Sequence, residues 1–425
     1  MSANFDITQL SEDLFRHESG KLVSLLTKIL GTENLQLAED VVQETFITAL
    51  NIWSLKGIPD NPSGWLFKTA KNKAIDVLRK NKFSTHVDFS DPNRQLLQSE
   101  YTLTTLFENL WREDDIQDDL LRMMFACCYP DISEEHQITL ILKTLCGFST
   151  TEIAKAFLTS EDTISKRLYR AKNFFREKKI KPQFPDQDHI PESIDAVLKA
   201  IYLIFNEGYN ATHSSAIIRK DLLDQAMYLC RLMVDNKNTQ LPEVFAAMAL
   251  MCFHYARIDS RINSEGEIIL LAQQNRSKWN RKLIEEGNDY MNKAAFGETI
   301  SSYHIEAAIA FEHCIAETFE DTNWKQILHY YEMLLQLYPS SVVRLHRLTV
   351  IFKLYGAEKV LEEISFSPDK MEWEKNYLYH SLMGDVYASI DSLRSINHYS
   401  KAMEMTLSEA EKKLLKRKIE RLLEL

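Results

Sequence analysis

Helical periodicity is the feature that most constrains how this chain can fold. Apolar residues recur at three- and four-residue spacing through most of its 425 residues, and no segment shows convincing strand alternation. Residues Leu22, Leu25, Leu26, Ile29 and Leu30 illustrate the pattern. With only 11 glycines and 10 prolines, the chain is also poor in the residues that form turns. We therefore predict an all-α protein built from long helices.

Two stretches of different composition divide the chain. Residues 84–119 carry nine acidic and two basic side chains and are predicted to form a linker. Residues 182–191, rich in proline, are predicted to form a second linker. The predicted domains are therefore a helical domain at 1–83, a second helical domain at 120–181 and a helical extension at 192–425.

The sequence lacks the motifs that are typical of several classes of protein. The first residues do not resemble a signal peptide, and no apolar stretch is long enough to span a bilayer. The six cysteines form no CxxC pair and show no zinc-type spacing, although the adjacent Cys127 and Cys128 leave a redox pair as an alternative. No glycine-rich phosphate loop or nucleophile elbow is present. We expect a cytoplasmic protein that is not an enzyme and has no metal or cofactor.

The second predicted domain contains a helix-turn-helix pattern. A capping box at Ser149–Glu152 starts one helix, and a second helix is predicted from near Glu161 to about Lys179. Eight basic residues face three acidic ones between positions 161 and 181, although the whole chain has a net charge of -11. Such a face suits DNA phosphates and base edges, although a solvated helix of an ordinary bundle would also explain it. The apolar face of the second helix is formed by Ile164, Leu168, Ala171 and Phe175.

The first predicted domain contains two further patterns. Asp40, Gln43 and Glu44 share one helical face, which would suit an arginine-rich partner surface, or simply water. The segment 62–82 carries six basic residues and one acid, with Trp65 and Phe67 nearby, which suits single-stranded DNA. Packing in the core is the alternative role for the two aromatic residues.

Three segments in this order resemble the bacterial extracytoplasmic-function (ECF) sigma factors of RNA polymerase. Residues 37–46 (LAEDVVQETF) resemble their polymerase-clamp helix, and residues 62–80 resemble the helix that melts and reads the -10 promoter element. Residues 147–172 resemble region four, which reads the -35 element. The resemblance covers roughly residues 10–180, without a region three. It implies a protein that binds core RNA polymerase, directs it to promoter DNA and promotes melting.

The resemblance also implies roles for particular residues. Polymerase contacts are expected at Asp40, Gln43, Glu44 and Phe46. Contacts with the -10 element are expected at Trp65, Lys68, Lys71, Asn72, Lys73, Arg79 and Lys80. Contacts with the -35 element are expected at Ser165, Lys166, Arg167, Tyr169, Arg170 and Lys172.

The extension resembles the tetratricopeptide-like extension of one branch of these sigma factors. Matching segments include 198–212 and 274–280, although Gln273 and Asn280 stand where that branch has acids. Gly208 is predicted to be a left-handed helix cap. The resemblance implies regulation through a protein or peptide partner, whereas a closed bundle that only stabilises the chain is the alternative. A stand-alone helix-turn-helix regulator with a helical sensor domain is the alternative function, but it leaves the patterns of the first domain unexplained.

Overall fold

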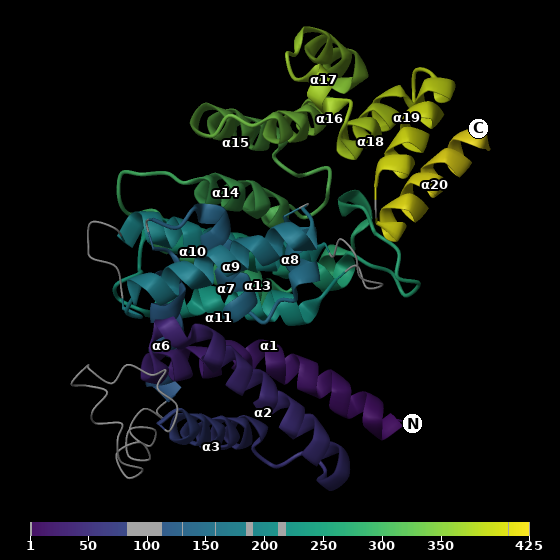
Figure 1. The fold of residues 1–425 in the computed structure, drawn as a ribbon. Helices are drawn as coiled ribbons and strands as arrows, with labels where there is room; N and C mark the ends of the chain where they lie inside the picture. Colours follow the sequence, from purple (N-terminus) through teal and green to yellow (C-terminus); the bar gives the residue numbers. More distant parts are fainter. Residues whose placement is uncertain are drawn as a thin grey trace. The chain divides into compact units, whose positions relative to one another are not determined.

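The computed structural model describes residues 2–82, 113–129, 131–157, 159–183, 190–210, 218–406 and 408–424. Within these ranges the regular secondary structure is helical, apart from an isolated bridge between Ile262 and Ile268 (Figure 1). The prediction of an all-α protein is confirmed.

The chain forms two compact units that do not coincide with the predicted domains. The first comprises Met1–Ile204 and Asp224–Thr239, and the second comprises Phe205–Leu223 and Gln240–Leu425. The start of the predicted extension therefore belongs to the first unit.

Three helices open the first unit: α1 (Ser2–Leu30), α2 (Leu35–Lys56) and α3 (Pro62–Lys82). Gly31, with a φ of 87°, lets the chain turn between α1 and α2, because side-chain-bearing residues rarely adopt this conformation. The side chain of Trp53 is 1% exposed, and its ring meets that of Trp65 edge-on at 5.4 Å. This contact joins the end of α2 to the start of α3.

Four helices follow: α6 (Glu113–Cys127), α7 (Glu134–Thr144), α8 (Thr150–Ala156) and α9 (Glu161–Lys178). The predicted capping box is confirmed, because Glu152 N donates to Ser149 Oγ at 3.1 Å and Ser149 N donates to Glu152 Oε2 at 2.8 Å. Helix α6 begins inside the predicted acidic linker. Residue Asp119 of that linker is buried and pairs with Lys28 of α1 at 2.7 Å; most of the linker lies outside the described residues.

Two helices of the predicted extension, α10 (Ile190–Tyr209) and α11 (Lys220–Asp235), contribute to the first unit. Lys199 of α10 pairs with Glu134 of α7 at 2.6 Å. The ammonium group of Lys21, on α1, lies 5.4 Å from the ring centroid of Tyr228, on α11. These contacts attach the start of the extension to the helices that precede it.

The second unit begins with the apolar helix α12 (Pro242–Tyr255), α13 (Arg281–Ala294) and α14 (Ser302–Ile315). It continues with α15 (Trp324–Leu337), α16 (Ser341–Phe366), α17 (Lys370–Trp373), α18 (Tyr377–Tyr387), α19 (Ser392–Met405) and α20 (Glu409–Leu423). Helix α16 is broken at Gly356, where φ is 80°. Gly384 allows α18 to approach α19 closely, since a Cβ there would lie 2.3 Å from Tyr399 Cε1.

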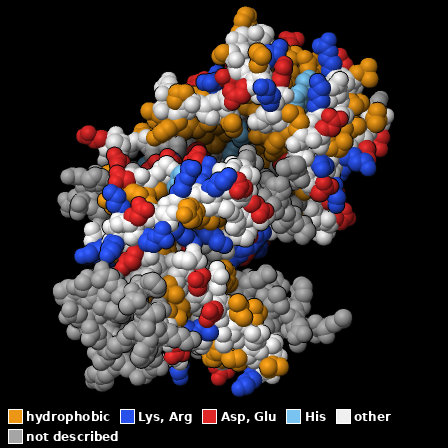
Figure 2. Space-filling view, in the orientation of Figure 1, with side chains coloured by type: hydrophobic (Ala, Val, Ile, Leu, Met, Phe, Trp, Pro, Cys, Tyr) orange, Lys and Arg blue, Asp and Glu red, His pale blue; other side chains and the backbone are white. Residues whose placement is uncertain are grey.

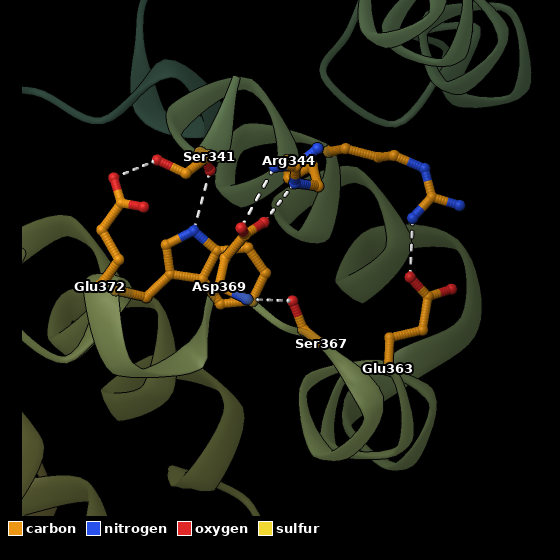
Figure 3. Close-up of polar contacts among 8 residues, drawn as sticks. Ser341, Arg344, Glu363, Ser367, Asp369 and Glu372 are labelled. Atoms are coloured by element: carbon orange, nitrogen blue, oxygen red, sulfur yellow. Dashed lines mark hydrogen bonds and ion pairs between the residues drawn. The ribbon is translucent and has the colours of Figure 1, made fainter. Parts of the chain in front are cut away.

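A polar network joins α16 to α17 (Figure 3). Trp373 Nε1 donates to the carbonyl oxygen of Ser341 at 2.8 Å, and Arg344 binds the carboxylate of Asp369 through two nitrogens. Arg347 pairs with Glu363 at 2.6 Å. Each guanidinium group in this network thus has a carboxylate partner.

Basic and acidic side chains are interspersed over the face of the molecule that Figure 2 shows. Among the described helices, none combines the length and the apolar character needed to cross a bilayer.

Candidate nucleic-acid and protein interfaces

Helix α2 carries a continuous exposed stripe. Asp40, Gln43 and Glu44 are exposed on one face, while Val41, Val42 and Ala49 are buried on the other. The exposed face continues with Ile47 (58% exposed) and Leu50 (38% exposed). Sequence reasoning missed Ile47 and grouped Leu50 with the apolar side of the helix, although the spacing of both residues from Asp40 places them on the exposed face. The stripe combines charge with apolar area, as protein interfaces do.

Phe46 does not belong to this stripe. Its side chain is 5% exposed and meets the ring of Phe15 edge-on at 5.0 Å. The structure therefore places Phe46 in the core between α1 and α2, where it supports the helix and offers no surface to a partner.

Helix α3 distributes its predicted DNA contacts unevenly. Lys68 and Asn72 are exposed, whereas Trp65, Lys71 and Lys73 are half-buried. Lys73 lies 3.5 Å from Glu44 of α2, so the structure brings together a predicted DNA contact and a predicted polymerase contact. The side chains of Arg79 and Lys80 lie outside the described part of α3.

Helix α9 presents four of its six predicted DNA contacts to solvent. Ser160 Oγ caps the helix by accepting a hydrogen bond from Thr163 N at 3.2 Å. The predicted apolar face is buried, which leaves the opposite face outward. Lys166 pairs with Asp162 of the same helix, at 2.6 Å. The four exposed residues are Ser165, Lys166, Tyr169 and Arg170.

The other two predicted contacts, Arg167 and Lys172, are held by the protein itself. Arg167 pairs with Glu135 of α7. Lys172 pairs with Glu39 of α2 and donates to Gln36 Oε1 at 3.0 Å. Glu39 is 7% exposed and also accepts a hydrogen bond from Thr144 Oγ1 at 2.7 Å. In this structure Lys172 therefore faces α2.

Helix α1 and the turn that follows it also contact the region of α7–α9. Arg16 pairs with Glu152 of α8 at 2.6 Å. Gly20 lies so close to the backbone of Leu145 that a Cβ would be 1.9 Å from its carbonyl oxygen. Thr32 Oγ1 donates to the carbonyl oxygen of Ile180. These contacts hold α1 and α2 against α7–α9.

All six cysteines are buried and none is in a disulfide within the described residues, and no cluster of three His, Cys, Asp or Glu suited to a metal occurs in the described ranges. Burial raises the pKa of Cys146 and Cys230 to about 12 and that of Cys314 to about 11. The pKa of Cys127 and Cys128 is raised as well, chiefly by burial. The thiolate, which is the reactive form, is therefore strongly disfavoured.

We accordingly expect the native protein to resist alkylation by iodoacetamide at pH 8, whereas urea should expose all six thiols. Mass spectrometry counts the modified residues in each state. Rapid modification of Cys127 or Cys128 in the native protein would support the alternative that these two cysteines form a redox pair.

Two parts of the chain match known protein families. Residues 14–84, which include α2 and α3, match the model of sigma-70 region 2, and residues 193–295 match a family of unknown function (DUF6596). An ECF RNA polymerase sigma factor, SigL of Mycobacterium tuberculosis, is 30% identical over 135 residues, which cover 32% of this chain and 70% of that protein. The chain belongs to the ECF RNA polymerase sigma factors.

Two other relatives of this sigma factor match different lengths of its chain. An uncharacterized protein of Rhizobium meliloti is 33% identical over 351 residues, covering 83% of this chain and 81% of its own length. The RNA polymerase sigma factor YlaC of Bacillus subtilis is 26% identical over 163 residues, covering 38% of this chain and 87% of its own length. No solved structure matches the chain. The protein thus has a sigma factor's role in transcription initiation, and the Rhizobium relative shares most of the extension too.

Proposed function

We propose that this sigma factor binds core RNA polymerase through the exposed stripe of α2 and reads promoter DNA with α3 and α9. The observation that carries the proposal is the stripe itself, which pairs Asp40, Gln43 and Glu44 with exposed Ile47 and Leu50. Exposed large apolar side chains beside acids support a partner surface that is both apolar and basic.

Two observations support the DNA-reading part of the proposal. Lys68 and Asn72 are exposed on α3, where cationic and amide groups suit the phosphates and bases of single-stranded DNA. Lys166, Tyr169 and Arg170 are exposed on α9, at helical spacing that suits the major groove. In this proposal α3 acts at the -10 element and α9 acts at the -35 element.

The proposal assigns regulation through protein contacts to the extension. A groove of about 790 Å³ runs along its helices and is lined by Tyr379, Met383 and Tyr387, with His380 and His398 beside them. Tyr387 and the exposed Met405, which also lines the groove, supply apolar contact area for a peptide of a partner protein.

The test uses the full chain, core polymerase and transcription from genomic DNA fragments in vitro. Lys166→Ala and Arg170→Ala are each expected to lower promoter use because each removes a DNA contact, by about 1–3 kcal/mol per lost base contact. Polymerase binding should stay unchanged because both side chains lie on α9, away from the α2 stripe. Lys237→Ala, in the exposed turn after α11, is the matched control.

Two results would contradict the proposal. Equal loss of polymerase binding and promoter use in the α9 variants would remove the division of roles between α2 and α9. Specific binding of duplex DNA without polymerase would favour the stand-alone regulator.

A further inference from the structure

Two sequence motifs that the proposed function does not use meet in the second unit. The matching segment 198–212 contains the end of α10, and the matching segment 274–280 contains Trp279. Tyr209 Oη accepts a hydrogen bond from Arg257 Nη2 at 2.9 Å, and the guanidinium group of Arg261 lies 3.6 Å from the centroid of the Tyr209 ring. Trp279 Nε1 donates to Ser260 Oγ at 2.8 Å, one residue from Arg261.

Gly208 belongs to the same corner, but the prediction that it forms a left-handed cap is wrong. The helix continues to Tyr209, and Gly208 is not among the residues with positive φ. A Cβ at this position would lie 2.9 Å from Leu223 N and 3.0 Å from the carbonyl oxygen of Arg219. Glycine is required here by close packing of the backbone.

Three arginines in this corner lack acidic partners. Arg257 is 8% exposed, and Arg261 and Arg276 are half-buried. None of them forms an ion pair with a carboxylate of the described residues, in contrast to Arg344 and Arg347 of the same unit (Figure 3). Burying a charge without a partner is costly, so other groups must offset the buried charge of Arg257.

Helix ends offset part of this charge. Arg261 donates to the carbonyl oxygen of Tyr209, the last residue of α10. Arg276 donates to the carbonyl oxygens of His313 and Ala316, at the end of α14, at 2.5 and 2.8 Å. The end of a helix carries roughly half a negative charge, so each of these two ends offsets part of the charge of one arginine.

The same group of residues also contains hydrogen-bonding nitrogens that are not used. Arg257 Nε and Arg276 Nη2 are buried and have no hydrogen-bond partner in the described structure, and the same holds for His313 Nδ1. Both guanidinium groups flank Trp279, at 5.7 and 4.5 Å from its ring centroid. Burial and the two arginines lower the pKa of His313 to about 3, so its imidazole is neutral and can donate from Nδ1.

We propose that Arg257, Arg276 and His313 form a binding site for a doubly charged oxyanion, namely a phosphate group, either free or on a small organic molecule. Such a group is anionic, and its oxygens would accept hydrogen bonds from the three unused nitrogens beside the buried charge of Arg257. The site lies beyond the polymerase- and DNA-binding role, and its test needs neither partner.

The experiment is equilibrium dialysis of the full chain against inorganic phosphate, with sodium chloride holding the ionic strength constant. We expect saturable binding of one phosphate per chain. Arg276→Gln should weaken this binding by at least about tenfold, because a charge-assisted contact is lost. Lys278→Gln, which removes an exposed charge from the same segment, should leave it nearly unchanged. Circular dichroism verifies that both variants are folded.

A parallel titration with glycerol 3-phosphate identifies the source of the phosphate group. Tighter binding than inorganic phosphate assigns the site to an organic phosphate, and equal binding assigns it to the free ion. Absence of saturable binding, an equal response to chloride, or unchanged affinity in Arg276→Gln would overturn the proposal, because water then satisfies the unused donors. If Arg276→Gln does not fold, the proposal is tested by competition on the unaltered protein. Sulfate should then displace bound phosphate, whereas chloride should not.

Discussion

Replacing Glu39 by alanine is expected to lower the free energy of unfolding of the first unit by about 3 kcal/mol, because it breaks a buried ion pair from one side. Glu39 is 7% exposed and is shared by Lys172 and Thr144. Its removal leaves the ammonium group of Lys172, whose side chain is only 20% exposed, without its carboxylate. Urea unfolding followed by tryptophan fluorescence measures the loss.

The chain offers a matched control in Asp162→Ala. Asp162 also pairs with a lysine of α9, but the side chains of this pair are 73% and 68% exposed. Exposed pairs contribute up to about 1 kcal/mol, because water screens both charges. If both variants lost the same small amount of stability, the Glu39–Lys172 contact would not hold α2 against α9.

Reversing the charge of Asp40 is expected to weaken binding to core polymerase by at least about tenfold, because a basic partner surface would then meet a positive charge. Asp40 is exposed, and its hydrogen bond to Gln36, at 2.9 Å, stays within α2. The Asp40→Arg variant should therefore keep its fold. Surface plasmon resonance on immobilised core polymerase measures the affinity.

Asp235→Arg is the control for this reversal. Asp235 is exposed at the end of α11, away from the α2 stripe, and its reversal changes the net charge equally. Equal weakening by the two variants would show a general charge effect and would remove Asp40 from the proposed interface.

Features set by local sequence were predictable. The cap at Ser149 and the buried face of α9 depend on residues within one or two helical turns, so spacing alone identified them. The helical character of the chain followed from periodicity in the same way. The exposed acids of α2 were placed on one face for the same reason.

Features set by tertiary packing were not predictable. Phe46 matched a family motif, but its neighbour Phe15 lies on another helix, and only the fold shows that it is buried. Lys172 had the charge and the spacing of a DNA contact, and only the fold brings Glu39 to it. Arg257, Arg261 and Arg276 come together from separate parts of the sequence, so no local pattern predicted that they lie near one another.

The carboxylate of Glu152 restricts which substitutions the chain tolerates during evolution. It accepts the backbone N–H of Ser149 to start α8, and it also pairs with Arg16 of α1. Glutamine at this position would preserve the cap but lose the ion pair, whereas aspartate is shorter by one methylene and reaches less far. Positions 16 and 152 should therefore vary together among close relatives, while Ser149 is free to change to threonine.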